Sequence, residues 1–153
     1  MIIGLKRFVA TVGGIGYLPL APGTWAAIFT SIVWLITFKT FQSTDTLQLI
    51  ILPAVIIAGV YCSGKIINNS DKDPSYIVID EVAGMCLTLL FITPTYQNII
   101  AGLILFRFFD IVKPLGIKRM EKIRNGWGIM MDDVLAGFYA NVVLRLLIVI
   151  HIW

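Results

Sequence analysis

Five long apolar runs, separated by short polar or proline-containing segments, set the pattern of this sequence. A helix needs about 20 apolar residues to cross a bilayer, and several of these runs are shorter. Some are therefore expected to be tilted, half-buried or packed inside the bundle. The pattern predicts an all-α fold, a compact helical membrane bundle of about five to six helices in one domain over residues 1–153. The runs are 25–38, 47–64, 77–93, 98–112 and 134–153.

The segments before and inside the first runs add detail. Residues 1–11 fit a short amphipathic helix at the membrane interface. Residues 13–24 hold glycines and prolines that favour a loop, and Thr24 is predicted to be the N-cap of the next helix. A loop that leads into a capped helix start can bind an anion through free backbone N–H groups, although a plain turn explains the same residues. Pro53 interrupts the second run, which membrane helices tolerate.

The composition supports a membrane protein. The chain is 58% hydrophobic and only 14% charged, compared with roughly 25% charged residues in soluble domains. Its mean hydropathy is +0.89. The net charge of +3 is modest, and no basic tract is interleaved with aromatic residues, so nothing indicates nucleic acid or a protein partner. Cys62 and Cys86 stand in apolar stretches, where buried thiols are expected rather than a disulfide.

The lysines and arginines predict an orientation. If the N-terminus is cytoplasmic and all five runs cross, the outer loops hold only Lys39. The cytoplasmic loops then hold Lys6, Arg7, Lys65, Lys72, Lys113, Lys118, Arg119, Lys122 and Arg124. The same topology brings carboxylates to the cytoplasmic ends of three helices, at one membrane depth: Asp80, Glu81, Asp110, Asp132 and Asp133.

These five acids in apolar surroundings need a partner, because an unpaired buried carboxylate is costly. A divalent cation such as Mg²⁺ would remove the repulsion between them. On a helix, Asp110 lies three residues from both Arg107 and Lys113, so the three can share a face. A carboxylate for a metal beside two cations for phosphate oxygens suits phosphoryl chemistry. Gly84 and Gly137 follow the acids by one turn and would allow a close helix approach.

Simpler interpretations remain open for each feature. Asp110 and Arg107 could form a buried ion pair, and Asp132 could be an N-cap with Asp133 in the first turn. Asp80 and Glu81 could also belong to a helix start. Three basic groups have structural explanations: the strip Lys118, Arg119, Lys122 and Arg124 faces headgroups, Arg145 snorkels outward or pairs within the bundle, and His151 is interfacial. The only histidine, His151, falls on the far side from the acids in this topology, so a phosphohistidine intermediate and a His-ligated metal are disfavoured. No P-loop is present.

Four blocks of the sequence resemble, in order and spacing, those of the phosphatidylglycerophosphatase A family, from about residue 14 to 137. They are G-I-G-Y-L-P-L-A-P-G-T-W, D-P-S-Y-I-V-I-D-E-V-A-G-M, F-R-F-F-D-I-V-K-P and G-I-M-M-D-D-V-L-A-G. The resemblance implies a helical bundle that hydrolyses phosphatidylglycerophosphate to phosphatidylglycerol and phosphate with Mg²⁺. It also implies a multi-pass protein of the bacterial cytoplasmic membrane. Gly116 replaces a second proline after Lys-Pro, and no serine follows Gly-Thr, which affects loop shape.

Carried over position by position, the resemblance makes Asp80, Glu81, Asp110, Asp132 and Asp133 the catalytic and metal-binding acids, and Lys113 the family lysine. Arg107 and Lys113 would hold the phosphate, with the helix start at Thr24 assisting, on the cytoplasmic side. Which acid is the general base, and whether an aspartate is phosphorylated, stays open. Two other classes remain: a cation-binding or transport protein, and a lipid-binding subunit without turnover. A transport path would spread its acids through the membrane depth, whereas these gather at one side.

Overall fold

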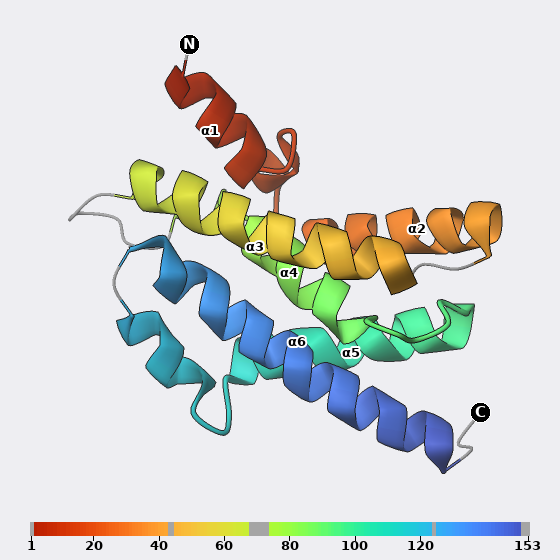
Figure 1. Cartoon of the computed structure of the whole chain (residues 1–153). Coiled ribbons are helices and arrows are strands. Elements are labelled where there is room, and N and C mark those ends of the chain that lie inside the picture. The colour runs from red at the N-terminus through yellow and green to blue at the C-terminus, as the bar shows by residue number, and fades with distance from the viewer. Residues whose placement is uncertain (1, 43–44, 68–73, 124, 151–153) are drawn as a thin grey trace.

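The computed structural model describes residues 2–42, 45–67, 74–123 and 125–150 (Figure 1). These residues form six α-helices and two short 3₁₀ helices, with no strand among them, so the all-α prediction is confirmed. The α-helices are α1 (Ile2–Ala10), α2 (Pro22–Phe41), α3 (Asp45–Ile66), α4 (Ile79–Thr88), α5 (Tyr96–Val112) and α6 (Gly126–Val149). The 3₁₀ helices are η1 (Ile15–Tyr17) and η2 (Ile117–Lys122).

Helix α4 differs most from its apolar run. It has 10 residues and ends at Thr88, so it is about 15 Å long. A bilayer core is about 30 Å thick, so α4 is too short to cross it by itself, and the rest of the run 77–93 continues as a turn after Thr88. The short helix instead lies inside the bundle, where it packs against α2, α3, α5 and α6 (Figure 1).

Two predicted helix starts also change. Helix α2 begins at Pro22 with Ala21 at its N-cap, so the predicted N-cap role of Thr24 is wrong. Proline suits the first position of a helix because its missing N–H is not needed there. Helix α6 begins at Gly126 and has no acid in its first turn. The interpretation of Asp132 as an N-cap is therefore wrong as well, because that residue lies in the second turn.

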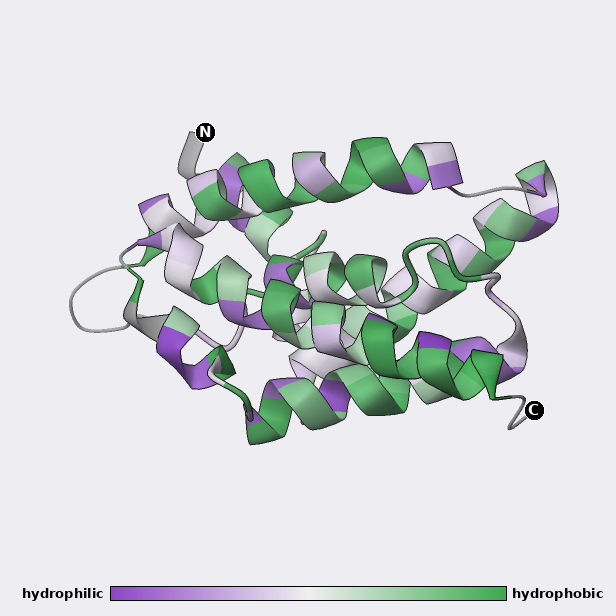
Figure 2. Cartoon of the chain, turned by 60° about the horizontal axis from the view of Figure 1, so that its bottom comes forward, coloured by the Kyte–Doolittle hydropathy of each residue, from purple (hydrophilic) through white to green (hydrophobic). Residues whose placement is uncertain are grey.

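Helices α2 and α3 are long and apolar enough to cross a membrane, with 20 and 22 residues. Only 28% and 22% of their most apolar windows are buried within the fold. Most of this apolar surface therefore faces outward, as a lipid-facing helix requires. Hydrophobic residues also recur along the other long helices (Figure 2), and Cys62 and Cys86 are buried free thiols, as predicted. The fold thus has the features of a membrane-associated protein.

Helices α4 and α6 pass each other at two glycines. A Cβ built on Gly137 would clash with the backbone carbonyl of Gly84. A Cβ on Gly84 would clash with the Phe106 ring and with the backbone carbonyl of Asp133. The missing side chains therefore let the two backbones approach closely, as the glycine spacing predicted.

Replacing Gly137 with alanine is expected to lower the thermal unfolding midpoint, because overpacking typically costs about 1–3 kcal/mol. Thermal unfolding of the detergent-solubilised protein measures this. Gly4→Ala is the matched control, since nothing lies within 4 Å of a Cβ on that helical glycine. Without a clash, alanine favours a helix over glycine by about 1 kcal/mol. Equal midpoints for the two variants would contradict the close crossing.

Candidate active site

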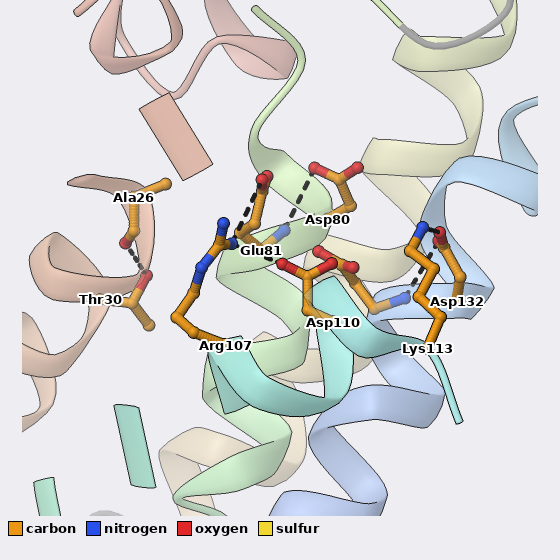
Figure 3. Close-up of polar contacts among 9 residues, drawn as sticks. Ala26, Thr30, Asp80, Glu81, Arg107, Asp110, Lys113 and Asp132 are labelled. Carbon is orange, nitrogen blue, oxygen red and sulfur yellow. Dashed lines mark hydrogen bonds and ion pairs between the residues drawn. The ribbon is translucent and has the colours of Figure 1, made fainter. Parts of the chain in front are cut away.

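Three helices bring their acidic residues close together (Figure 3). Asp80 and Glu81 lie in the first turn of α4. Asp110 lies in the last turn of α5, and Asp132 and Asp133 lie in the second turn of α6. Since α4 and α6 cross one turn further along, at Gly84 and Gly137, their acids are held at short range.

The centre of this end is a cluster of three acids, Asp80, Glu81 and Asp133. One carboxylate oxygen from each lies within 4.8 Å of the others. Asp80 and Asp133 are only 8% and 4% exposed. The second oxygen of Glu81, Oε2, is buried and has no hydrogen-bond partner in the described part of the chain. An unpartnered buried carboxylate oxygen beside two further acids fits a cation ligand, because such an oxygen is otherwise costly.

The electrostatics of the cluster agree with that fit. Burial raises the pKa of Asp80 well above its ordinary value, and the neighbouring carboxylates of Glu81 and Asp133 raise it further. Burial also raises the pKa of Glu81, although the Arg107 guanidinium opposes the shift. A divalent cation would favour the ionised forms of all three. Carboxylate oxygens are the ligands that suit Mg²⁺.

Arg107 connects α5 to this cluster. Its Nη1 lies 2.6 Å from Asp110 Oδ2 and 3.8 Å from Glu81 Oε1 (Figure 3). The buried ion pair considered from the sequence is therefore present, and it also reaches α4. The Arg107 Nε is buried without a hydrogen-bond partner among the described residues. The guanidinium thus retains a donor that an anionic ligand could satisfy.

Lys113 turns away from the face that the sequence predicted. Helix α5 ends at Val112, and Lys113 is its C-cap in the left-handed conformation, with φ 47° and ψ 49°. The expectation that Lys113 continues the helical face of Asp110 is therefore wrong. Its Nζ instead donates to Asp132 Oδ2 at 2.5 Å, which connects α5 to α6. Asp110 and Asp132 are thus each paired with a cation at the edge of the cluster, and Asp110 also lies beside Asp133.

The first turn of α2 covers the cluster from another side. A Cβ on Gly23 would clash with Glu81 Oε1 and would lie 3.1 Å from Arg107 Nη1. Backbone N–H groups in a first helical turn have no intrahelical acceptor, so this turn offers donors near the acids. Of the pair Gly-Thr in the first block, the sequence pattern pointed to Thr24, whereas Gly23 is the residue that touches the cluster. Thr24 itself is half-buried in this turn.

The remaining basic residues do not all fall within the described residues. Lys118 and Arg119 are exposed on η2, which agrees with a headgroup-facing strip. Arg145 donates to the carbonyl of Leu90 at 2.8 Å, so it pairs within the bundle. The side chain of Lys122 lies outside the described residues, as do Lys72, Arg124 and His151.

Comparison with known proteins assigns the chain to a family. The family model described as Phosphatidylglycerophosphatase A matches residues 8–148. A Bacteroides thetaiotaomicron protein named "Putative phosphatidylinositol-3-phosphatase" is 38% identical over 147 residues, which cover 92% of this chain and 91% of the relative. Phosphatidylglycerophosphatase A of Haemophilus influenzae is 38% identical over 133 residues, which cover 85% of this chain and 80% of the relative. The Escherichia coli protein of the same name is 31% identical over 126 residues, which cover 81% of this chain and 72% of the relative.

No solved structure matches the chain. The family model nevertheless covers nearly all of it, and it includes every acid and both paired cations described above. The relatives from Haemophilus influenzae and Escherichia coli carry the name of the same family. The chain therefore belongs to the phosphatidylglycerophosphatase A family, and it is a phosphatase.

Proposed function

We propose that this protein hydrolyses phosphatidylglycerophosphate to phosphatidylglycerol and inorganic phosphate, with Mg²⁺ held by Asp80, Glu81 and Asp133. The observation that carries the proposal is the cluster of three carboxylates within 4.8 Å of one another, beside two cations at the same end of the bundle. A bound Mg²⁺ would polarise the phosphate and activate water. Of the five acids predicted from the sequence, this proposal makes three the metal ligands.

The other site residues have separate roles in this proposal. Asp110 holds the guanidinium of Arg107, and Asp132 holds the ammonium of Lys113. The two cations would bind the phosphate oxygens and stabilise the charge that develops on them during hydrolysis. The first turn of α2, at Gly23 and Thr24, would add backbone N–H donors to the same phosphate.

A second substrate has a specific observation in its favour. The Bacteroides thetaiotaomicron relative, at 38% identity over 92% of this chain, is named for phosphatidylinositol 3-phosphate. Both lipids carry a phosphomonoester, so the cluster and its cations serve either one. The two substrates differ in the headgroup alcohol that carries this phosphate, glycerol or inositol, and a direct comparison of turnover distinguishes them.

Phosphate release by the purified protein in detergent micelles tests the function. We expect faster release from phosphatidylglycerophosphate than from phosphatidylinositol 3-phosphate. Activity should disappear in EDTA and return with excess Mg²⁺, because the proposed cation would polarise the phosphate and activate water. Full activity in EDTA would contradict the metal site, and faster release from the inositol lipid would favour the second substrate. No release from either lipid would contradict both proposed substrates.

The distribution of basic residues supports an active site at the cytoplasmic face. The helix ends around the acids carry Lys65, Lys113, Lys118 and Arg119, and α1 adds Lys6 and Arg7. The opposite end of the bundle, where α2 ends and α5 begins, carries Lys39, whose Nζ donates to the hydroxyl of Tyr96. Lysine and arginine favour the cytoplasmic side of bacterial membrane proteins. We therefore propose that the protein crosses the cytoplasmic membrane several times and that its active site faces the cytoplasm.

Cysteine labelling in intact and opened cells measures this orientation. A cysteine at exposed Gln42 is expected to react with a membrane-impermeant maleimide in spheroplasts. A cysteine at exposed Lys118 should react only after the membrane is opened. The unsubstituted protein is the control, since Cys62 and Cys86 are both buried. Labelling of the Lys118 site from outside would reverse the proposed orientation.

A further inference from the structure

Helix α4 ends inside the bundle, and side chains from two other helices hold its last carbonyls. From α6, Asn141 Nδ2 donates to the carbonyls of Thr88 at 2.9 Å and Leu90 at 3.0 Å. From α3, Gln48 Nε2 donates to the carbonyl of Leu89 at 3.1 Å. The last carbonyls of a helix lack intrahelical donors, and leaving them unpaired in apolar surroundings costs several kcal/mol. We call Asn141, Gln48 and Arg145, which also donates to Leu90, the α4 anchor.

The α4 anchor lies at the end of a regular pairing between two parallel helices. Asn141 and Thr88 are separated by 53 positions in the sequence. The same separation relates Gly137 to Gly84, where the backbones touch, and Asp133 to Asp80 in the acid cluster. One turn of helix lies between successive pairs. The repeated pattern D-E-V-A-G and D-V-L-A-G follows this separation.

We propose that Asn141, assisted by Gln48 and Arg145, is a positioning residue that fixes α4 along the axis of α6 and so places Asp80 and Glu81 opposite Asp133. This inference rests on the proposed metal site. Sliding α4 by one residue would move its acids by about 1.5 Å along the axis. A misplacement of about 1 Å in an active site can lower a rate by about 10²-fold.

Among the contacts between α4 and α6, those of Asn141 are best suited to fix the position of α4 along α6. The glycine crossing permits a close approach, but glycine has no side chain that could stop one helix sliding on the other. Thr88 Oγ1 is 3.5 Å from the Gly137 carbonyl, which is a long hydrogen bond. Asn141, in contrast, binds two carbonyls of α4 at once and belongs to the same helix as Asp133. Helix α6 therefore contacts α4 at both of its ends, through Asp133 at the start and through Asn141 at the finish.

Hydrogen–deuterium exchange and Mn²⁺ affinity test the inference on three purified variants. Asn141→Leu removes the two donors with a side chain of similar size. Asn98→Leu is the matched control, because Asn98 is also buried and donates its amide to a carbonyl, that of Thr93 at 2.8 Å, outside the α4–α6 pair. Asn141→Gln keeps an amide at the same position. Mn²⁺ replaces Mg²⁺ because electron paramagnetic resonance detects it directly.

We expect α4 amides to exchange faster in Asn141→Leu, and Mn²⁺ to bind about 10-fold or more weakly, as for loss of a group that orients metal ligands. Asn98→Leu should leave both quantities unchanged even where its unfolding temperature falls, and Asn141→Gln should restore part of the affinity. Unchanged α4 exchange in Asn141→Leu, or an equal loss in both leucine variants, would overturn the inference. A wild-type protein that binds no Mn²⁺ would contradict the proposed metal site, and α4 exchange would then decide the positioning role by itself.

Discussion

Asp133→Asn is expected to lower phosphatase turnover by about 10²–10³-fold or more, the range seen when a group that stabilises developing charge is removed. Asparagine has nearly the same volume as aspartate but no charge, so a metal would lose a ligand while the packing stays. Asp133 is buried within the cluster, where it supplies one of the three grouped carboxylates. For the same reason, extra Mg²⁺ should rescue the variant poorly. Phosphate release by the purified variant, with Mg²⁺ varied, measures the effect.

The control for this variant is Asp45→Asn, which makes the same chemical change in the first turn of α3, at the opposite end of the bundle. It should retain full turnover. Asp80→Asn should behave like Asp133→Asn, because both residues belong to the cluster. A folded Asp133→Asn protein with wild-type turnover would exclude the cluster from catalysis.

Lys113→Ala is expected to lower turnover by about 10²-fold, in the range for loss of a charged contact to the transition state. Lys118→Ala should have a far smaller effect, because Lys118 is exposed on η2. Lys113 also neutralises Asp132, whose side chain is only 8% exposed. Its removal could therefore lower activity through an uncompensated buried charge rather than through the phosphate.

A double variant separates these two effects. In Lys113→Ala with Asp132→Asn, no unpaired carboxylate is left at this position, so the unfolding temperature should recover relative to Lys113→Ala. Turnover should stay low, because the phosphate has still lost its cation. Recovery of turnover together with stability would show that Lys113 serves only to neutralise Asp132. Equal losses in Lys113→Ala and Lys118→Ala would contradict a specific role for Lys113.

The apolar pattern predicts the helices well where a run corresponds to one helix. Runs 25–38, 47–64 and 98–112 lie within α2, α3 and α5. The apolar pattern does not predict where α4 ends within 77–93, because an apolar residue is buried equally well in a helix and in a turn. The chain turns after Thr88, and the carbonyls freed there bind Gln48, Asn141 and Arg145, side chains more than 40 positions away. No local feature of the sequence reports such distant donors.

The topology predicted from the sequence brings the five acids to one end of the bundle, but it does not predict which of them pair with which cation. Asp110 pairs with Arg107 of its own helix, whereas Asp132 pairs with Lys113, which leaves the helical face of Asp110 and turns toward α6. One local feature was informative: Lys113 precedes Pro114, and proline disfavours helical backbone in the residue before it. The choice of Asp132 as partner depends on how α5 and α6 pack, which sequence spacing does not specify.

The left-handed backbone of Lys113 has a consequence for protein engineering. A side chain in that conformation costs roughly 1–2 kcal/mol, whereas glycine adopts it freely. Glycine is the usual residue where a helix ends this way. The chain instead carries a lysine, so local conformational stability is lower here than it could be, and a cation stands beside Asp132. Glycine at position 113 would therefore raise stability only together with Asp132→Asn, which leaves no unpaired carboxylate, and selection for heat resistance alone would then remove the cation proposed to bind the phosphate.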